Sequence, residues 1–238
     1  MLHTTRAVVL RTVKYTDKST VLKACTEMFG TRSYLVRTGQ KGGSKNAALQ
    51  PLSRVEMVVS ESHERDMHSV RELRVERPYM QLSSDPMRGM LALFAQEVLY
   101  RTLREETGDL ALFFFVQEAL EAMDTGEDVP SFPLKLLVQL MQHLGISPGS
   151  PLPTELRFDM REGCFFAGMP PHELCMAPPQ SALFAALLNA DWNDTVASKR
   201  EPASVRRALL DDLLIYYRLH VEGFGELRSP AVLHALLT

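Results

Sequence analysis

Cysteine is scarce in this chain: its 238 residues include only Cys25, Cys164 and Cys175. Three scattered cysteines cannot build the disulfide framework of a small secreted domain, and they are typical of a reducing compartment. No apolar run approaches the roughly 20 residues of a membrane-spanning helix, so we expect no membrane partner. Residues 1–6, MLHTTR, lack the features of a secretory signal. The sequence therefore predicts a cytoplasmic protein.

Motifs of hydrolytic enzymes are also missing. The chain has no Gly-x-Ser-x-Gly and no His-Glu-x-x-His, and its seven histidines are scattered. No nucleophile, base and orienting group stand together in the sequence. This pattern favours a protein that is not an enzyme; an active site assembled within the C-terminal part is the alternative.

A metal site has little support. Cys164, His172 and Cys175 lie within twelve residues, with Asp159 shortly before them. Structural zinc usually requires two close ligand pairs such as Cys-x2-Cys, and no such pair is present. We therefore predict no metal and no other cofactor, and interpret this segment as a hairpin with one packed and one loop cysteine.

Charge is distributed unevenly along the chain, whose formal net charge is −3. Residues 1–80 hold 14 Lys and Arg against 8 Asp and Glu, a net charge of +6, which leaves −9 for residues 81–238. Such asymmetry indicates a basic binding module attached to an acidic body. Chance variation between small modules is the alternative.

Residues 1–80 have the pattern of a β module. Short runs rich in β-branched residues are separated by turns, with no helix of comparable strength between them. The expected strands are 6–13, 20–26, 32–37, 54–60 and 70–76. Five strands in a small module favour a closed barrel, because an open sheet would leave its edges uncovered. The leading candidate is the five-stranded OB-fold that binds oligonucleotides.

Residues 81–238 have a helical period. Asp85 and Pro86 are a good N-cap and first helical residue, and one apolar stripe follows. It consists of Leu91, Phe94, Ala95, Val98, Leu99 and Leu103. Further helices are expected at 110–123, 132–144, 180–189 and 202–221, with a last one opening at Ser229-Pro230. A small hairpin is expected near 155–176. The predicted class is α+β: an N-terminal OB-fold barrel (1–80), then a mostly α-helical domain (81–238).

The segment 36–52, VRTGQKGGSKNAALQPL, is a glycine-rich basic loop between two predicted strands. It does not match a nucleotide-binding loop, because the second glycine and the Ser/Thr of that motif are missing and Pro51 interrupts any following helix. Arg37, Lys41 and Lys45 recur every four residues. We interpret the segment as a flexible rim loop that tracks a phosphate backbone, with a merely solvated loop as the alternative.

Aromatic residues of the β module are candidates for base stacking. They are Tyr15, Phe29, Tyr34 and Tyr79. Phe29 and Tyr34 fit a barrel core better, whereas Tyr15 is better placed on a rim.

An ordered series of motifs resembles one bacterial family. Leu10-Arg11 lies in the first predicted strand, and the later motifs are KYTDKS at 14–19, TEMFG at 26–30 and LQPL at 49–52. ALF at 92–94, EVL at 97–99, HLGISP at 143–148 and LLIYYRLHVEGFGELRSPAVL at 213–233 follow. Together they resemble the recombination mediator RecO over nearly the whole chain.

The resemblance implies a non-catalytic protein of DNA repair and homologous recombination. Members bind single- and double-stranded DNA, anneal complementary strands and work with RecR. They also bind the C-terminal tail of single-strand-binding protein, and so help to load RecA. A cytoplasmic, nucleoid-associated protein is implied. Many members carry a four-cysteine zinc motif where residues 156–175 lie here; this chain lacks it, which supports the prediction of no zinc.

Two sets of site residues follow. For phosphate contacts we expect Lys14, Lys18, Arg32, Arg37, Lys41 and Lys45. For the acidic, apolar tail of single-strand-binding protein the candidates are Arg206, Arg207 and Arg218 on the long C-terminal helix; ordinary solvated charges are the alternative. A protein-only adaptor whose barrel does not bind DNA is the competing function.

Overall fold

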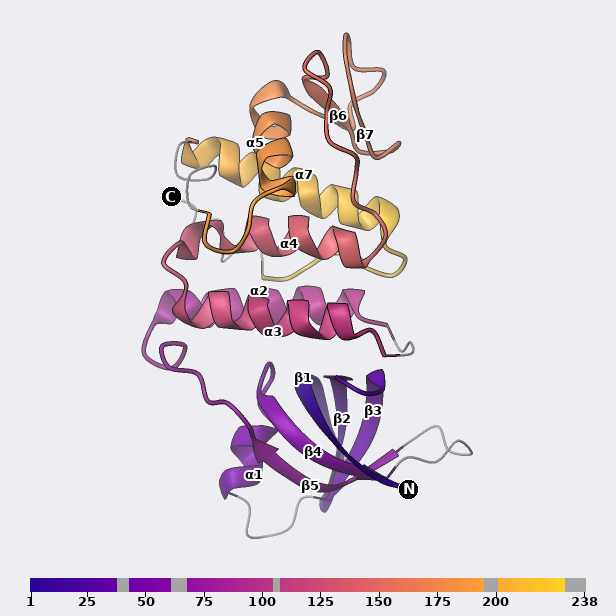
Figure 1. Ribbon diagram of the computed structural model, residues 1–238, viewed down its shortest axis with the longest axis vertical. Coiled ribbons are helices and arrows are strands. Elements are labelled where there is room, and N and C mark those ends of the chain that lie inside the picture. Colours follow the sequence, from indigo (N-terminus) through magenta and orange to yellow (C-terminus); the bar gives the residue numbers. More distant parts are fainter. Residues whose placement is uncertain (38–42, 61–67, 105–107, 195–200, 230–238) are drawn as a thin grey trace. The chain divides into compact units, whose positions relative to one another are not determined.

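The computed structural model describes residues 1–37, 43–60, 68–104, 108–194 and 201–229. The chain forms two compact units: residues 1–80 with 98–120, and residues 81–97 with 121–238. Figure 1 labels the helices and strands of both. Among the helices of the described ranges, none is long and apolar enough to cross a membrane.

Five strands close into a barrel in the first unit. They are β1 (Leu2–Thr16), β2 (Ser19–Thr26), β3 (Gly30–Arg37), β4 (Arg54–Ser60) and β5 (His68–Val75). The order around the barrel is β1-β2-β3-β5-β4. Only the short β3–β5 pairing is parallel among these pairs. The predicted α+β class with a five-stranded OB-fold barrel is confirmed.

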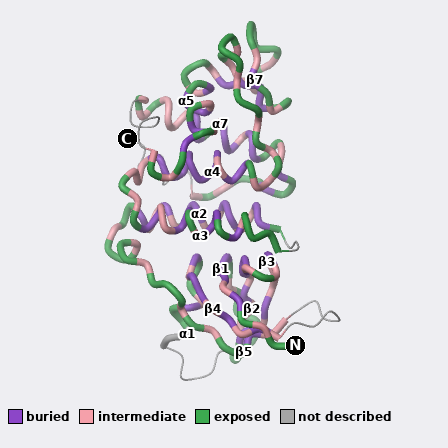
Figure 2. The backbone as a smooth tube through the Cα atoms, in the orientation of Figure 1, coloured by how far each residue is buried: buried purple, intermediate pink, exposed green. Residues whose placement is uncertain are grey.

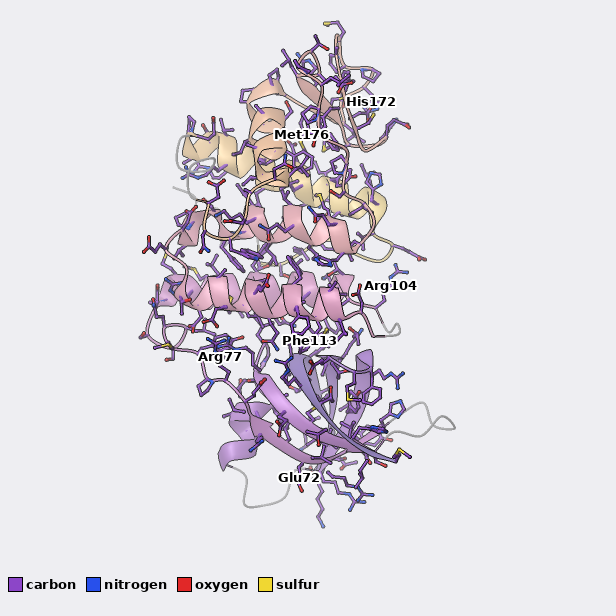
Figure 3. The ribbon with its side chains drawn as sticks, in the orientation of Figure 1. Glu72, Arg77, Arg104, Phe113, His172 and Met176 are labelled. Atoms are coloured by element: carbon purple, nitrogen blue, oxygen red, sulfur yellow. The ribbon has the colours of Figure 1, made fainter. Side chains whose placement is uncertain are left out.

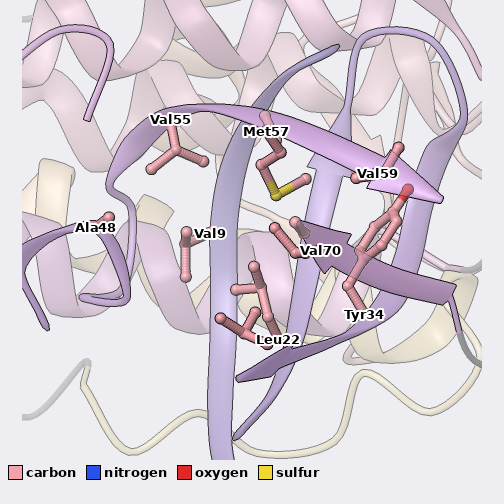
Figure 4. Close-up of a cluster of buried hydrophobic side chains, with 11 residues drawn as sticks. Val9, Leu22, Tyr34, Ala48, Val55, Met57, Val59 and Val70 are labelled. Carbon is pink, nitrogen blue, oxygen red and sulfur yellow. The ribbon is translucent and has the colours of Figure 1, made fainter. Parts of the chain in front are cut away.

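The barrel interior is filled by alternate side chains of its strands. Leu22 and Ala24 of β2 and Tyr34 and Val36 of β3 belong to the buried cluster in Figure 4, together with side chains of the other three strands. Successive side chains of a strand point to opposite faces, so the residues between these four face outward. The tube in Figure 2 shows buried and intermediate stretches along the strands of the barrel.

The segment after β3 differs from the prediction. We expected no helix there, but α1 spans Gly43–Ala48. Pro51 does not interrupt this helix, because it lies three residues beyond its end. Ala48 is fully buried and belongs to the barrel core (Figure 4), so burial of one small side chain anchors the helix.

Leu52 ends this connection in an unusual backbone conformation. Its φ is 62°, and among the described residues it is the one non-glycine residue with positive φ. Three hydrogen bonds hold the place: Leu52 N to Val9 O (2.7 Å), Val9 N to Ser53 O (3.0 Å) and Tyr79 Oη to Leu52 O (2.7 Å). The Leu52 side chain is 1% exposed. The left-handed region disfavours a leucine by roughly 1–2 kcal/mol, which these bonds and this burial offset.

The helices follow the predicted apolar periods. They are α2 (Pro86–Thr102), α3 (Leu110–Thr125), α4 (Phe132–His143), α5 (Pro178–Leu188) and α7 (Ala203–His220). Asp85 caps α2, since its Oδ1 accepts the Met87 amide at 2.9 Å. All six residues of the predicted α2 stripe are buried. The last predicted helix begins at Ser229-Pro230, and from Pro230 onward it lies outside the described residues.

Three buried polar side chains of the second unit donate hydrogen bonds to carbonyl oxygens. Tyr217 Oη donates to Leu137 O and Tyr216 Oη to Ile146 O, both at 2.7 Å. Lys135 is 2% exposed and donates to the carbonyls of Trp192, at 3.1 Å, and Asp194. Burial lowers the pKa of Lys135. These bonds fix α4 against α7 and against the segment that follows α5.

A small sheet occupies the region of the expected hairpin. Strands β6 (Arg157–Asp159) and β7 (Cys164–Phe166) pair antiparallel, and β8 (Cys175–Met176) adds on the other side of β6. The sequence did not indicate this third strand. Phe158 is buried and its ring lies 4.9 Å from those of Phe165 and Phe184, so aromatic packing joins the sheet to α5.

Candidate nucleic-acid interface

The hairpin of β1 and β2 carries two of the predicted phosphate-binding lysines, Lys14 near the end of β1 and Lys18 in the turn. Lys14 Nζ lies 2.7 Å from Asp17 Oδ1, and their side chains are 73% and 92% exposed. So exposed an ion pair is weak and is easily exchanged for another anion. Lys18 lies in the turn itself, where its amide donates to Thr16 Oγ1.

Strand register brings Arg37 to the same end of the barrel. Ser19, next to the turn, is the direct partner of Arg37 at the end of β3, and Thr16 is the partner of Ser19. Arg37 is exposed. Within the described residues, neither Lys18 nor Arg37 has an ion pair. The structure therefore places Lys14, Lys18 and Arg37 together, and we call these three the turn cluster.

Arg32 lies elsewhere. It pairs with Ala24 and stands five residues before Arg37, roughly 16 Å along the strand. Its guanidinium carbon lies 5.4 Å from the centre of the Phe29 ring. Lys41 lies outside the described residues, and so does the side chain of Lys45, whose backbone is part of α1.

An ion pair marks the end of the barrel where Arg32 lies. Arg6 donates to Glu27 through both Nε (2.9 Å) and Nη2 (2.6 Å), and its guanidinium lies over the Phe113 and Phe114 rings of α3. Figure 3 labels Phe113. The hydrogen bonds from Arg6 lower the pKa of Glu27, and those to Glu27 raise the pKa of Arg6. This arginine is therefore engaged within the protein.

Two further cations on the barrel were not among the predicted phosphate contacts. Arg11 of β1 and Lys23 of β2 are direct cross-strand partners. Both lie against Tyr100 of α2: the Arg11 guanidinium carbon is 5.0 Å and Lys23 Nζ 5.2 Å from the ring centre, and Arg11 Nη1 donates to Tyr100 Oη at 2.9 Å. The outward alternation of β2 was the available signal for Lys23. The contact with a residue some 80 positions later had no local signal.

The four aromatic candidates divide between core and surface. Tyr34 is fully buried in the barrel, and Phe29 is partly buried against the same core, so both core interpretations are confirmed. Tyr79 is engaged with Leu52 O and lies 4.5 Å below the guanidinium of Arg54. Tyr15 is 63% exposed. Of the four, Tyr15 is thus the one with its ring in solvent.

The small sheet brings three possible metal ligands together. Within the described residues, Asp159, His172 and Cys175 form the one such group, with ligand atoms within 4.8 Å of one another. His172 lies between the other two and contacts both. Its Nε2 is 3.2 Å from Asp159 Oδ2, and its Nδ1 is 3.6 Å from Cys175 Sγ. Figure 3 labels His172. Burial raises the pKa of the Cys175 thiol.

This group does not fit the four-thiolate zinc site that the resemblance implies for many relatives. It supplies one thiol, and both ring nitrogens of His172 already face protein partners. Cys164, the other sequence candidate, is exposed and is not part of the group. The Asp159 carboxylate is held by the amides of Arg161 (2.8 Å) and Glu162 (3.1 Å), as in a turn that closes a hairpin.

The three arginines proposed for the second unit do not form one cluster. Arg206 and Arg207 are half-buried near the start of α7, and Arg206 Nη1 donates to Glu201 O at 2.7 Å. Arg218 is exposed twelve residues later, about 18 Å along the helix axis. At the end of α7, His220 Nε2 lies 2.8 Å from Met160 O and the His220 ring centre lies 4.2 Å from that of Tyr216, so this histidine is packed within the second unit.

These features define a class: an OB-fold barrel with a cationic surface, joined to a mainly helical C-terminal part. Comparison with known proteins gives the family. The family model described as "Recombination protein O N terminal" matches residues 1–79, and "Recombination protein O C terminal" matches residues 83–150.

Curated relatives match the sequence over nearly the whole chain. The DNA repair protein RecO of Porphyromonas gingivalis strain W83 is 30% identical over 246 residues, which cover 99% of both chains. Those of Azobacteroides pseudotrichonymphae and Bacteroides fragilis are 28% and 29% identical, also over 99% of both chains. The chain belongs to the RecO family of DNA repair and recombination proteins, and the predicted resemblance is confirmed.

Proposed function

We propose that this chain is a non-catalytic recombination mediator whose barrel binds single- and double-stranded DNA. The observation that carries the proposal is the turn cluster: register gathers Lys14, Lys18 and Arg37 at one end of a module with net charge +6. Cations on a closed barrel neutralise phosphates and release counterions, so binding tolerates sequence and weakens with salt. Lys41, Lys45 and Arg32 belong to the proposal as flanking phosphate contacts.

We expect the same cationic surface of the barrel to promote the annealing of complementary strands. Two complementary strands repel each other through their phosphates, and a shared cationic surface reduces that repulsion. We further propose that the protein acts with RecR and the tail of single-strand-binding protein, and so helps to load RecA on coated DNA. Residues 1–80 would serve as the DNA-binding module and 81–238 as the partner-binding domain.

The test is DNA affinity at several salt concentrations. Fluorescence anisotropy with a labelled single-stranded oligonucleotide gives the slope of log K against log salt. In Lys18→Gln/Arg37→Gln this slope should fall by about 1.4, because each lost phosphate contact removes about 0.7 on single strands. Arg161→Gln changes an exposed arginine in the turn between β6 and β7; it is the matched control and should leave the slope unchanged.

The protein-only adaptor makes the opposite prediction. A wild-type protein that binds no DNA even at low salt would refute the DNA-binding proposal and favour the adaptor. Binding with a slope that Lys18→Gln/Arg37→Gln does not alter would instead remove the turn cluster from the interface.

For the tail of single-strand-binding protein we propose the start of α7. Arg206 and Arg207 are adjacent and half-buried, so they can present charge beside apolar surface, whereas Arg218 lies about 18 Å away along the helix. A labelled acidic tail peptide should bind the full chain, and Arg207→Gln should weaken it severalfold more than Arg218→Gln. Equal effects of the two substitutions would contradict this placement.

A further inference from the structure

The central strand of the small sheet places a carboxylate between two thiols. Asp159 of β6 is the cross-strand partner of Cys164 in β7 and of Cys175 in β8. His172, in the loop that leads into β8, contacts Asp159 through Nε2, at 3.2 Å, and Cys175 through Nδ1, at 3.6 Å. Figure 3 labels His172 and Met176, which lie on either side of Cys175 in the chain. We call Asp159, His172 and Cys175 the relay.

The contacts of the relay determine which ring nitrogen of the neutral histidine carries the proton. A carboxylate can only accept hydrogen bonds, so the Nε2 that faces Asp159 is the nitrogen that donates. The lone pair is then on Nδ1, which faces Cys175 Sγ and can accept the proton of the thiol. The relay therefore has the order thiol, base and carboxylate that activates a nucleophile.

The carboxylate of the relay is held in place by the backbone. Asp159 is 5% exposed, and its Oδ1 accepts the amides of Arg161 and Glu162, at 2.8 and 3.1 Å. Its Oδ2 is the atom that faces His172. A fixed acceptor on one side of the imidazole orients the other nitrogen toward the thiol, which is the role of the third group beside an activated nucleophile.

The three cysteines of the chain differ in the surroundings of the thiol. Burial raises the pKa of Cys25 to about 11, and this residue is 3% exposed. Burial, and after it the charge of Asp159, raises the pKa of the exposed Cys164. Burial also raises the pKa of Cys175, but the backbone amide of His172 opposes the shift. Cys175 thus combines partial access to solvent with a histidine in contact.

We propose that Cys175 is a modification site: a nucleophilic thiol that His172 and Asp159 activate toward small disulfides such as glutathione disulfide. This inference goes beyond the proposed function and does not depend on it. The raised pKa of Cys175 leaves the thiol protonated at rest, so reaction requires a base beside it. His172 is that base, and Asp159 is a positioning residue that acts through it.

The reaction is a thiol–disulfide exchange. The proton of Cys175 Sγ passes to His172 Nδ1, and the Asp159 carboxylate stabilises the resulting imidazolium. The thiolate attacks one sulfur of the disulfide, whose S–S bond breaks as the bond to Cys175 forms. The departing thiolate takes the proton from His172. Cys175 is thereby oxidised to a mixed disulfide while one small thiol is released, so no other oxidant is needed.

The experiment follows each cysteine of the full chain separately. Wild type and His172→Gln are incubated with glutathione disulfide at pH 7, and peptide mass spectrometry measures the adduct on every cysteine over time. The rate at Cys175 should fall about tenfold in the variant, which corresponds to one pKa unit in the amount of thiolate. The rate at Cys164, which is not part of the relay, should be unchanged.

Controls separate loss of the base from loss of structure. Glu173→Gln alters the exposed neighbour of His172, whose charge is not among the causes of the Cys175 pKa shift, and should leave both rates unchanged. Unfolding of the small sheet would expose Cys175 and accelerate its reaction, which is opposite to the expected result. The buried Cys25 reports global unfolding and should stay unmodified in every variant.

Three outcomes would overturn the inference. Equal rates at Cys175 in wild type and His172→Gln would show that the histidine does not activate the thiol. A parallel fall at Cys164 would show that the substitution acts without specificity. Reaction of Cys175 only after treatment with a chelator would mean that the relay holds a metal. Failure to bind DNA would refute the proposed function and leave this inference unaffected.

Discussion

Tyr15 in the first unit and Tyr217 in the second stand at opposite ends of the exposure range. Tyr15 is 63% exposed beside two cationic residues, Lys14 and Lys18. Tyr217 is fully buried, and its hydroxyl donates to Leu137 O at 2.7 Å. A tyrosine that is packed and hydrogen-bonded stabilises the fold, whereas one held in solvent near cations is available to a ligand.

Carboxylates of the two units differ in the same way. Glu27 of the barrel accepts two bonds from Arg6, and its pKa is lowered. Asp212 of α7 is partly buried, and burial, followed by the charge of Asp211, raises its pKa to about 6. The fold thus stabilises the ionised form of Glu27 and destabilises the ionised form of Asp212.

The largest effect is expected at Tyr217. Tyr217→Ala removes a fully buried ring and should lower the free energy of unfolding by about 4 kcal/mol. Tyr15→Ala should change it by less than about 0.5 kcal/mol, because the ring makes no core contact. Urea denaturation of both variants measures the free energy of unfolding. Similar losses in the two variants would show that Tyr15 contributes to stability as Tyr217 does.

The next largest effect is expected at Asp212, and it depends on pH. A carboxyl whose folded pKa is raised to about 6 stabilises the protein least above pH 6, where it must be ionised in the fold. Asp212→Asn should therefore stabilise the protein by about 2 kcal/mol at pH 8, and the gain should vanish near pH 4. Thermal denaturation across this range checks it. Asp211→Asn removes the neighbouring charge, the second cause of the raised pKa, and should lower the pKa of Asp212 toward its ordinary value.

Glu27 should show the opposite pH dependence with a smaller effect. Its lowered pKa contributes stability that is present above the ordinary glutamate pKa of about 4.3 and is lost as pH falls below it. At pH 7, Glu27→Gln should lose about 0.5–1 kcal/mol, a small value because the Arg6 side chain is 37% exposed. Denaturation curves of wild type and variant should converge toward pH 3. A difference that persists there would mean the loss does not come from the ion pair.

Periodicity was sufficient to predict much of the fold. Runs rich in β-branched residues between turns indicated the five strands in residues 6–76. The stripe from Leu91 to Leu103 indicated α2, because burial of one face imposes a repeat on the sequence. Helix α1 was missed because it has only six residues, which are too few to establish a helical period. Strand β8, with two residues, is likewise too short to leave a pattern.

The candidate interface was less predictable. Arg37 and Lys18 lie at the same end of the barrel because Ser19 pairs with Arg37. This pairing depends on strand register, which spacing along the chain does not reveal. Arg32 has the right charge, but lies at the other end of the strand. Arg11 and Lys23 depend on Tyr100, a long-range contact. Residue type could be read from the sequence; which cations share a surface could not.

Leu52 shows how one position can be specified by two conflicting requirements. Its backbone, at φ 62°, suits glycine or asparagine, while its buried side chain suits a large aliphatic residue. No natural amino acid satisfies both. In a saturation library, valine and isoleucine should be depleted most among aliphatic residues, because β-branching worsens the backbone conflict without improving the packing. Substitution tolerance here would follow a compromise, so neither hydropathy nor turn propensity alone would rank the variants correctly.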